Sequence, residues 1–494
     1  MKQTFALDTL VIRMNDPEWQ TLDLYQRIHR ALRALILQGV LEAGMKLPSS
    51  RTLSRSLQVA RDTVENAYAQ LHRDGFMVRR EGSGSYVADH LGKALKGKVR
   101  AHRTKAAPPN THTTLLSERG QHWLEQGSVA DQQRVSAFAT GLPETRAFPT
   151  AVWERLQRKV LKEHRDHILL HGDPQGAAPL RKAIATYLNL ERGANVTPEH
   201  ILVLSSTRQA LYLCAQLLSD AKQTVLIENP SYLGAQKAFQ AAQAQLQAIP
   251  VDAHGICIDT LIADRSNATC VYVTPSHQYP TGATLSLERR LALTQWAAEH
   301  GKWIIEDDYD SEFHYDGPPI ACVQGVDTQQ RTLYLGTFAK TLYPGLRIGY
   351  MALPPALVKP FTAARSIMDG HTPQLHQLTL ARFMDDGHYA AHIRAMRKLY
   401  AARRAVLFNA LEQHLTDVVT VQRPPGGLQV PCWLKPGWGE AQTIQYAANV
   451  GIRLQGLSRL YQGSSTQQGW LLGYASLTEY EIETAVRRLA QALA

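Results

Sequence analysis

The sequence of 494 residues has few cysteines and no long hydrophobic run, and both absences restrict what the chain can be. No stretch approaches the roughly 20 uninterrupted apolar residues that a membrane-spanning helix needs. The opening MKQTFALDTL is too polar for a secretory signal, so we expect neither a signal peptide nor a membrane segment. The five cysteines are scattered without a C-x-x-C pair, which argues against disulfides and favours a reducing cytoplasm.

The sequence also lacks the ligand pairs of a metal site. Its dense acidic cluster, DDYD at residues 307–310, stands without paired histidines or a second acidic cluster. A metal is therefore a weaker interpretation of this segment than a cofactor-binding strand end. We expect no bound metal.

Positive charge is concentrated at one end of the chain. Residues 1–110 contain 18 Lys and Arg against 10 Asp and Glu, whereas the remaining residues contain 35 against 33. A basic excess confined to one end is typical of a domain that contacts a polyphosphate such as DNA. A solvated basic surface would have the same composition.

Residues 18–88 have the pattern of three helices followed by a hairpin. Apolar residues near a 3.6-residue period predict a helix over 21–40, Ser49 or Ser50 is expected to cap a short second helix, and a third helix follows over 60–74. FMVRREGSGSYVAD then predicts two short strands around a Gly-Ser turn. This order predicts a winged helix-turn-helix, in which the third helix would enter the DNA major groove.

Four residues of this domain are expected at the DNA. Arg51, at the start of the second helix, is placed to hold a phosphate. Arg61 and Thr63, at the start of the third helix, are placed to contact bases or phosphates. Gly82, in the turn of the hairpin, would let the wing approach the backbone closely.

The periodicity disappears beyond this domain and then returns. KALKGKVRAHRTKAAPPNTHTT is basic and then rich in small residues and proline, which predicts an exposed linker over 89–117. Over 118–494, short apolar runs such as ILVL, TVLI and CVYV alternate with helical segments. This alternation predicts an α/β domain with a largely parallel sheet covered by helices on both faces, followed by a small C-terminal α+β lobe.

A lysine follows one of these buried runs, in TLYLGTFAKTLYPGLRIGY. The amine of Lys340 could form a Schiff base with an aldehyde cofactor, and Arg347, seven residues later, could hold the cofactor's phosphate. A lone lysine at a strand end is more often a surface residue. Three further segments, ENPSYLGA, TPSHQYPTG and IIEDDYDSEF, also follow apolar runs and favour the cofactor interpretation.

These segments present aromatic and acidic side chains at the carboxyl ends of strands, where α/β sheets bind their ligands. Tyr232 offers a ring that can stack on a pyridine, and Tyr279 lies in reach of the same place. Asp307 and Tyr309 are two residues apart and so point the same way from a strand. Asp307 suits a pyridine nitrogen and Tyr309 a phenolic oxygen.

Both halves of the chain resemble known families. The segment from LYQRIHRALRAL to REGSGSYVA resembles the GntR family of bacterial regulators. HGDPQG, TPSHQYPTG, IIEDDYDSEF and GTFAKTLYPGLRIGY resemble the fold-type I pyridoxal-phosphate enzymes of the aspartate aminotransferase superfamily. Together, over about residues 20–490, the chain resembles the MocR/GabR subfamily of GntR transcription regulators.

The resemblance implies a homodimeric regulator that binds pyridoxal 5'-phosphate (PLP), a double-stranded DNA operator and a small-molecule effector, either an amine or amino acid or PLP itself. It implies a Schiff base at Lys340, with Asp307 at the ring nitrogen, Tyr309 at the ring oxygen and Tyr232 stacked on the ring. It also implies that the phosphate is held by Arg347, Thr337, Thr207 and Arg208, and that the DNA is contacted by Arg51, Arg61, Thr63 and Gly82.

Departures from the aminotransferase pattern bear on activity. Tyr279 stands where these enzymes usually carry Asn, Ala339 replaces a common Ser, and His171 replaces a Tyr that reaches the neighbouring subunit's phosphate. GWLLGYASL has no arginine near Leu471, where transaminases clamp the substrate carboxylate, and Arg453 is the candidate to replace it. We therefore expect a regulator without turnover. An active aminotransferase with a DNA-binding head, or an aminotransferase fold that serves only as a dimerising scaffold, are the alternatives.

Overall fold

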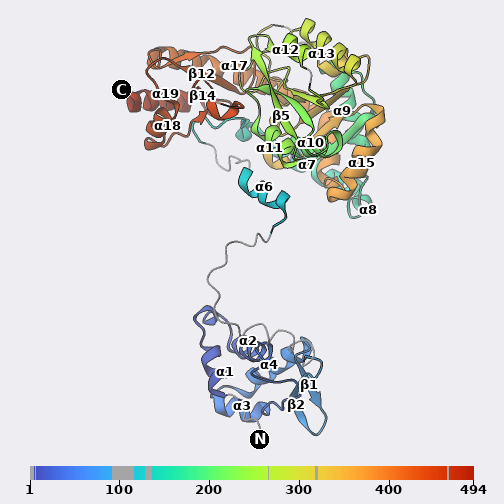
Figure 1. Ribbon diagram of the computed structural model, residues 1–494, viewed down its shortest axis with the longest axis vertical. Helices are drawn as coiled ribbons and strands as arrows, with labels where there is room; N and C mark the ends of the chain where they lie inside the picture. Colours follow the sequence, from blue (N-terminus) through green and yellow to red (C-terminus); the bar gives the residue numbers. More distant parts are fainter. Residues whose placement is uncertain are drawn as a thin grey trace. The chain divides into compact units, whose positions relative to one another are not determined.

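The computed structural model describes residues 5, 7–91, 116–127, 136–264, 266–317, 321–463, 465 and 467–494. The chain divides into two compact units, Met1–Leu115 and Leu116–Ala494 (Figure 1). Most of the predicted linker lies outside the described residues, since the structure describes only 89–91 and 116–117 of it.

The first unit is a winged helix-turn-helix. Its elements in chain order are α1 (Leu7–Met14), α2 (Leu24–Leu37), α3 (Ser50–Leu57), α4 (Arg61–Arg73), β1 (Met77–Arg80) and β2 (Gly84–Val87). The two strands pair antiparallel as the predicted hairpin. Ser49 is the cap of α3, because its hydroxyl accepts a hydrogen bond from the Thr52 amide at 3.1 Å.

Two features of this unit differ from the sequence analysis. Helix α2 is shorter than the predicted 21–40, because the chain turns at Asp23 before the helix and at Gly39, with φ +74°, after it. Helix α1 was not predicted at all. Its Leu10 and Met14 are buried in the same core as Leu32 of α2.

The second unit is built on an eight-stranded mixed sheet. Its strands are β3 (Ile201–Leu204), β4 (Thr224–Asn229), β5 (Gln245–Asp252), β6 (Gly255–Ile256), β7 (Cys270–Val273), β8 (Trp303–Asp308), β9 (Thr332–Thr337) and β10 (Gly349–Ala352). They lie in the order β3-β10-β9-β8-β7-β4-β5-β6. The five strands from β9 to β5 are parallel, whereas β10 runs antiparallel to both neighbours and β6 to β5. The sheet is therefore largely parallel, as predicted.

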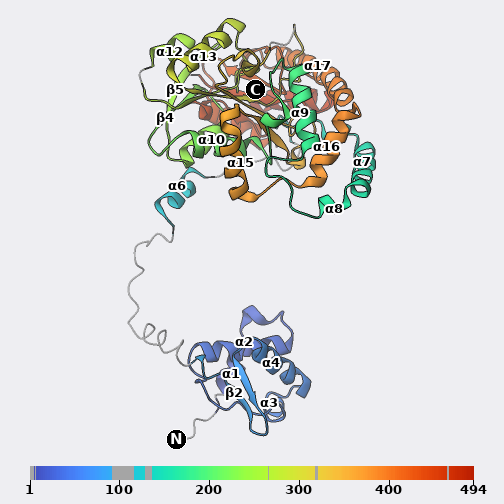
Figure 2. The same cartoon turned by 90° about the vertical axis from the view of Figure 1, so that its right-hand side faces the viewer.

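Helices cover both faces of this sheet, as Figure 2 shows. On one face, α10 (Thr207–Leu218), α11 (Leu233–Ala241) and α15 (Pro355–Asp369) share a core with the strands. On the other, α12 (Ile258–Ala263) and α13 (Leu287–His300) form a second core. The remaining helices are α7 (Thr150–Glu163), α8 (Arg165–Ile168), α9 (Ala178–Glu191), α14 (Val323–Val326), α16 (Gln374–Asp385) and α17 (His388–His414).

A smaller lobe follows the long helix α17. Its sheet has the order β11-β12-β14-β13, formed by β11 (Val419–Val421), β12 (Gln429–Leu434), β13 (Gln455–Gly456) and β14 (Gly469–Gly473). Its helices are α18 (Glu440–Asn449) and α19 (Glu479–Leu493). This is the predicted α+β lobe. None of the helices in the described part of the chain is long and apolar enough to cross a membrane.

A short helix at the start of the second unit, α6 (Glu118–Gln126), packs against α11. The indole nitrogen of Trp123 donates to the carbonyl of Ala241 at 3.0 Å, and its ring meets that of Tyr212 edge to face at 6.2 Å. The amine of Lys237 donates to the carbonyl of Gly127 at 3.3 Å. These contacts join the residues that follow the linker to α10 and α11.

Candidate cofactor site and DNA-binding surface

The strand ends of the large sheet bring the predicted cofactor residues to one edge. Leu204, Gly349 and Thr337 lie side by side across β3, β10 and β9, and Gly336 is level with Asp308 of β8. The start of α10 and the loop after β9 therefore leave the sheet at the same edge. This is the edge at which parallel α/β sheets bind their ligands.

Lys340 lies in the loop that follows β9, beside a segment that the sequence analysis missed. Its amine donates to the carbonyl of Gly141 at 2.6 Å. Gly141 has φ +66°, and a Cβ added there would lie 2.5 Å from the lysine nitrogen. A side chain at residue 141 would therefore have to displace the lysine amine, and the left-handed φ at this position also favours glycine.

The segment around Gly141 is also fixed to the small lobe. The amide of Gly473 in β14 donates to the carbonyl of Phe138 at 3.1 Å, and a Cβ on Gly473 would overlap the carbonyl of Ala139. Residues 138–141 thus connect the small lobe to Lys340. No periodicity or motif in the sequence indicated this role.

Asp307 is buried at the end of β8 and has one unused oxygen. Its Oδ2 accepts a hydrogen bond from the Tyr272 hydroxyl at 2.8 Å, whereas Oδ1 has no hydrogen-bond partner among the described residues. Burial raises the pKa of Asp307 to about 7, although the Tyr272 hydrogen bond and the charge of Lys340 oppose the rise. A buried carboxylate oxygen without a partner is costly, so the geometry fits a cationic N–H group from a ligand at this position.

The three predicted tyrosines lie next to one another in the site. The ring centroids of Tyr232 and Tyr279 are 5.7 Å apart, and those of Tyr279 and Tyr309 are 6.1 Å apart. The hydroxyl of Tyr309 donates to the carbonyl of His277 at 2.9 Å. An aromatic ligand ring would therefore meet aromatic side chains along one side of the site.

Thr207 and Arg208 lie in the first turn of α10, where the backbone amides and the helix dipole favour an anion. Ser206 caps this helix, since its hydroxyl accepts from the Gln209 amide at 3.3 Å. The guanidinium of Arg208 donates to the Tyr232 hydroxyl at 3.4 Å. The predicted phosphate residues of α10 and the predicted stacking ring are therefore neighbours.

The other two predicted phosphate residues lie in the loop after β9. The hydroxyl of Thr337 accepts from the amide of Ala339 at 3.1 Å, and this contact shapes the turn that precedes the lysine. Arg347 has left-handed backbone geometry, with φ +54°, and an exposed side chain. Its guanidinium has no ion-pair or hydrogen-bond partner among the residues that the structure describes, so it is available for an anion.

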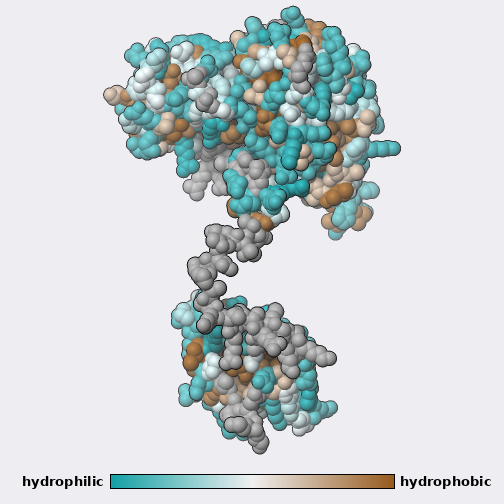
Figure 3. All heavy atoms as spheres, viewed as in Figure 1, coloured by the Kyte–Doolittle hydropathy of each residue, from teal (hydrophilic) through white to brown (hydrophobic). Residues whose placement is uncertain are grey.

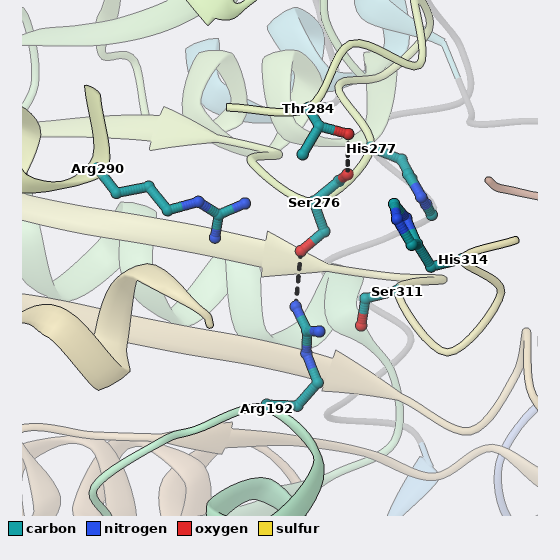
Figure 4. Close-up of a pocket in the computed structure, with 7 residues that line it drawn as sticks. All are labelled: Arg192, Ser276, His277, Thr284, Arg290, Ser311 and His314. Atoms are coloured by element: carbon teal, nitrogen blue, oxygen red, sulfur yellow. Dashed lines mark hydrogen bonds between the residues drawn. The ribbon is translucent and has the colours of Figure 1, made fainter. Parts of the chain in front are cut away.

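A small polar cavity borders the site (Figure 4). It is lined by Arg192, Ser276, His277, Thr284, Arg290, Ser311 and His314. Arg192 donates to the Ser276 hydroxyl at 2.8 Å, and Nδ1 of His277 lies 2.8 Å from Asp310. These bonds hold the turn whose His277 carbonyl receives the Tyr309 hydroxyl. No motif in the sequence indicated this support.

Arg192 also makes the pKa values of two adjacent carboxyl groups differ, those of Asp307 and Asp308. Its Nε lies 3.0 Å from Oδ2 of Asp308, which also accepts from the Tyr334 hydroxyl at 2.6 Å. Burial alone would raise the pKa of Asp308, but Arg192 and Tyr334 lower it below its usual value. Asp308 is therefore held ionised by the protein, whereas the pKa of Asp307 is raised.

The first unit presents the predicted DNA residues on its surface. The side chains of Arg51 and Arg61 are exposed, and neither has an ion pair or hydrogen bond to another of the described residues. Thr63 is half-buried in the first turn of α4, and Gly82 is exposed in the turn of the wing with φ +69°. Which of these residues touch DNA stays a prediction.

Basic residues of the wing were missed by the sequence analysis. The guanidinium of Arg79 bonds to Glu65 of α4 at 2.9 Å and so fixes the wing to the predicted recognition helix. Arg80 and Lys46 lie over the ring of Tyr86, at 4.6 Å and 5.7 Å from its centroid. Arg80 pairs with Gly84, which is two residues before Tyr86, so Arg80 and Tyr86 point to the same face of the hairpin. The alternation of side chains could therefore have indicated a basic face.

Comparison with known proteins covers both units. The family of bacterial regulatory proteins called gntR matches residues 24–87, and the aminotransferase class I and II family matches residues 138–489. The probable rhizopine catabolism regulatory protein MocR of Rhizobium meliloti is 34% identical over 470 residues, which is 95% of this chain and 93% of that protein. The chain belongs to the MocR-type GntR transcription regulators.

Other relatives agree with this family. The pyridoxine biosynthesis transcriptional regulator PdxR of Corynebacterium glutamicum is 28% identical, across 94% of both chains. Among solved structures, the multiple substrate aminotransferase of Thermococcus profundus is 28% identical with a TM-score of 0.69, and the match covers 76% of this chain and 96% of that one. This MocR-type protein is thus a transcription regulator with a GntR DNA-binding domain and a PLP-type domain of aminotransferase fold. Enzymatic activity is established neither way.

One feature of this MocR-type site bears directly on activity. Leu471, at the position where transaminases carry their carboxylate-binding arginine, is fully buried with Leu457 and Leu460 and packs near Tyr279. Arg453, which the sequence offered as a replacement, has an exposed side chain. The described residues contain no cluster of three or more side chains suited to a metal ion.

Proposed function

We propose that this MocR-type regulator binds PLP at Lys340 and changes its affinity for a DNA operator when it meets a primary amine or PLP. In this proposal residues 18–88 contact the DNA, 89–117 link the parts, and 118–494 bind the effector in the cytoplasm. The unpartnered buried oxygen of Asp307, close enough to Lys340 for their charges to interact, is the observation that carries the proposal.

The site residues would divide the binding of PLP among them. When bound, PLP supplies an aldehyde that joins an amine and a pyridine ring that withdraws electrons. Asp307 would keep the ring nitrogen protonated, because its Oδ1 has no partner among the described residues and can accept a hydrogen bond from the N–H group. Arg347, Thr337 and the first turn of α10 would hold the phosphate. The Gly141 carbonyl would orient the Lys340 amine.

Tyr232, Tyr279 and Tyr309 would enclose the ring of PLP. Tyr232 would stack on one face, because its hydroxyl is already tied to Arg208 at the phosphate end of the site. Tyr309 would turn its hydroxyl from the His277 carbonyl, or share it, to bond the phenolic oxygen of the ring. Tyr279 lies between these two rings and completes the enclosure.

The proposal does not include turnover as an aminotransferase. An apolar Leu471 cannot pair with the carboxylate of an amino-acid substrate, which transaminases must hold for reaction. A half-reaction assay separates the two functions. Conversion of pyridoxamine phosphate to PLP by 2-oxoacids should be no faster with this protein than with Lys340→Ala. Rapid conversion that requires Lys340 would instead favour the aminotransferase.

We also propose that the regulator is a homodimer. Leu169, Leu170 and Ile367 are 75%, 67% and 88% exposed, and Figure 3 shows hydrophobic surface near α8 and α15. Their segments are neighbours, since the rings of His171 and His371 lie 5.9 Å apart. A second copy would cover this surface. Light scattering should report a dimer that Ile367→Glu dissociates. The control Leu190→Glu changes an equally exposed leucine of α9 and should leave the dimer intact.

The experiment that tests the proposed function compares the absorption spectra of the full chain, Lys340→Ala and the surface control Lys359→Ala, each with added PLP. Wild type and the control should show the visible band of a lysine Schiff base, and Lys340→Ala should not. Operator affinity, measured in parallel with and without candidate amines, should change only in the two proteins that show the band. A wild type without the band would overturn PLP binding at Lys340. Unchanged operator affinity with every candidate ligand would overturn sensing.

A further inference from the structure

A chain of hydrogen bonds leads from Lys340 to the small lobe. The Lys340 amine donates to the Gly141 carbonyl at 2.6 Å, and the hydroxyl of the adjacent Thr140 donates to Oε1 of Gln455 at 2.7 Å. Nε2 of Gln455 in turn donates to the hydroxyl of Tyr279 at 2.9 Å. Beyond the lysine, every member of this chain is uncharged. We call Thr140, Gln455, Tyr279 and Leu471 the neutral wall.

Leu471 belongs to this wall because it is the cross-strand partner of Gln455 in β13 and β14. Cross-strand partners point to the same side of a sheet, so the two side chains are neighbours. Leu471 is fully buried and packs in a cluster that also contacts Tyr279. The wall thus combines one apolar side chain with hydroxyl and carboxamide groups.

Arg453 and Arg459 lie close to Gln455 in the sequence, but both side chains are exposed. Arg453 precedes β13 and has no hydrogen bond or ion pair within the described part of the chain. Arg459 acts on Tyr279 only through its charge: burial raises the pKa of Tyr279 to about 12, and the Gln455 bond and Arg459 oppose that rise. A carboxylate pressed against the neutral wall would therefore lose water without gaining a cation from it.

An uncharged polar group would find partners on the same wall. The Tyr279 hydroxyl accepts from Gln455, and its own proton has no acceptor among the residues that the structure describes. It can therefore donate to the oxygen of a ligand hydroxyl or carboxamide. The carboxamide of Gln455 retains a second N–H and a second lone pair for the same purpose.

We propose that the effector of this site is a primary amine whose other polar group is uncharged, a hydroxyl or a carboxamide. Gln455 and Leu471 select it against amino acids that carry a free carboxylate. This inference rests on the proposed function, because the amine of the effector meets the cofactor at Lys340. It goes beyond that function by naming the chemical class of the effector.

The test uses four amines that differ in one substituent: L-alanine, L-alaninamide, L-alaninol and isopropylamine. Their dissociation constants for the PLP-loaded full chain are measured by calorimetric titration and corrected for the fraction of unprotonated amine. We expect the amide and the alcohol to bind about tenfold more tightly than alanine, and more tightly than isopropylamine. The tighter ligands should also change operator affinity at lower concentration.

Three variants assign the selection to named residues. Gln455→Met removes the carboxamide while retaining length, and should bring alaninol and isopropylamine to similar affinity. Leu471→Arg should reverse the order in favour of alanine, and Leu471→Met, which keeps the wall apolar, should retain the wild-type order. If Leu471→Arg fails to fold, the wild-type series and Gln455→Met still decide the question.

Two results would overturn the inference while the proposed function stands. Alanine that binds as tightly as the amide and the alcohol would show that the wall does not select by charge. A preference for alanine that Arg459→Gln abolishes would assign carboxylate binding to Arg459. If none of the four amines binds the PLP-loaded protein, the proposed effector class is also refuted. Failure of the proposed function looks different, because the Schiff-base band of Lys340 would then be absent before any amine is added.

Discussion

The replacement Asp307→Asn should stabilise the second unit in the absence of PLP and at the same time weaken PLP binding. Burial raises the pKa of Asp307 from 3.8 to about 7. A rise of this size corresponds to about 4 kcal/mol, since each tenfold change in the dissociation constant is worth ~1.4 kcal/mol. The sign follows from the direction of the shift. Below pH 4 Asp307 is protonated in both the folded and the unfolded protein. The free energy of unfolding therefore falls as the pH rises from about 4 to about 7.

Asparagine removes the buried charge but leaves part of its amide without a partner, which costs about 1–3 kcal/mol. At pH 8 the PLP-free variant should therefore be more stable than wild type by roughly 1–3 kcal/mol. Near pH 4, where Asp307 is uncharged, only the cost of the amide remains, so the variant should there be less stable than wild type by about 1–3 kcal/mol. The assay is urea unfolding followed by tryptophan fluorescence, which reports mainly the second unit because seven of the eight tryptophans lie there. Added PLP should stabilise wild type much more than the variant.

Asp308→Asn is the matched control, because Asp308 adjoins Asp307 and is equally buried. Its pKa is lowered, so its contribution is present across pH 5–8 and is lost only in acid. Removing its charge leaves the buried guanidinium of Arg192 without its carboxylate partner, which should destabilise the unit by about 3–5 kcal/mol at pH 8. An Asp307→Asn protein that is less stable than wild type at pH 8, or a difference that is the same at pH 5 and pH 8, would refute the reasoning.

Three further predictions concern backbone and surface positions. Gly141→Ala should displace Lys340 and lower PLP affinity, whereas Gly127→Ala, at a similar φ but with open space around it, should leave PLP affinity unchanged in a spectral titration. Arg61→Ala should weaken specific DNA binding by about 1–3 kcal/mol in a mobility-shift assay, and an undiminished affinity would remove Arg61 from the interface. Ser49→Ala should destabilise the first unit by about 1 kcal/mol through loss of the α3 cap, while the exposed Ser56→Ala should have no measurable effect on thermal unfolding.

The sequence was informative where chemistry and local order coincide. Lys340 and Asp307 each follow an apolar run, and a run of that kind becomes a buried strand that delivers the next residues to the edge of the sheet. Capping and hairpin signals are equally local, which is why α3, α4 and the wing were predicted. Ser49 and Ser50 could not be separated, because both residue types cap helices and only the backbone geometry decides between them.

Contacts between distant segments could not be predicted from one sequence. Gly141 meets Lys340 across 199 positions, and Thr140 meets Gln455 across 315. Nothing in the residues around position 140 records those partners. Helix α1 escaped prediction for a related reason, since eight residues are too few to form a helix without the packing of Leu10 and Met14. The antiparallel direction of β10 was likewise invisible, because its run GYMA would suit a strand of either direction.

Helix α11 gives the ligand site a rigid connection to the chain that leads from the DNA-binding unit. Tyr232, the proposed stacking ring, lies at its first end, and Ala241, which holds the indole of Trp123, lies at its last. Nine helical residues span about 13 Å, and a helix of that length turns as one body. If a ring stacked on Tyr232 tilted α11, the end of the helix that holds Trp123 would move with it. Because the indole of Trp123 is bonded to the last residue of α11, its fluorescence would report such a movement.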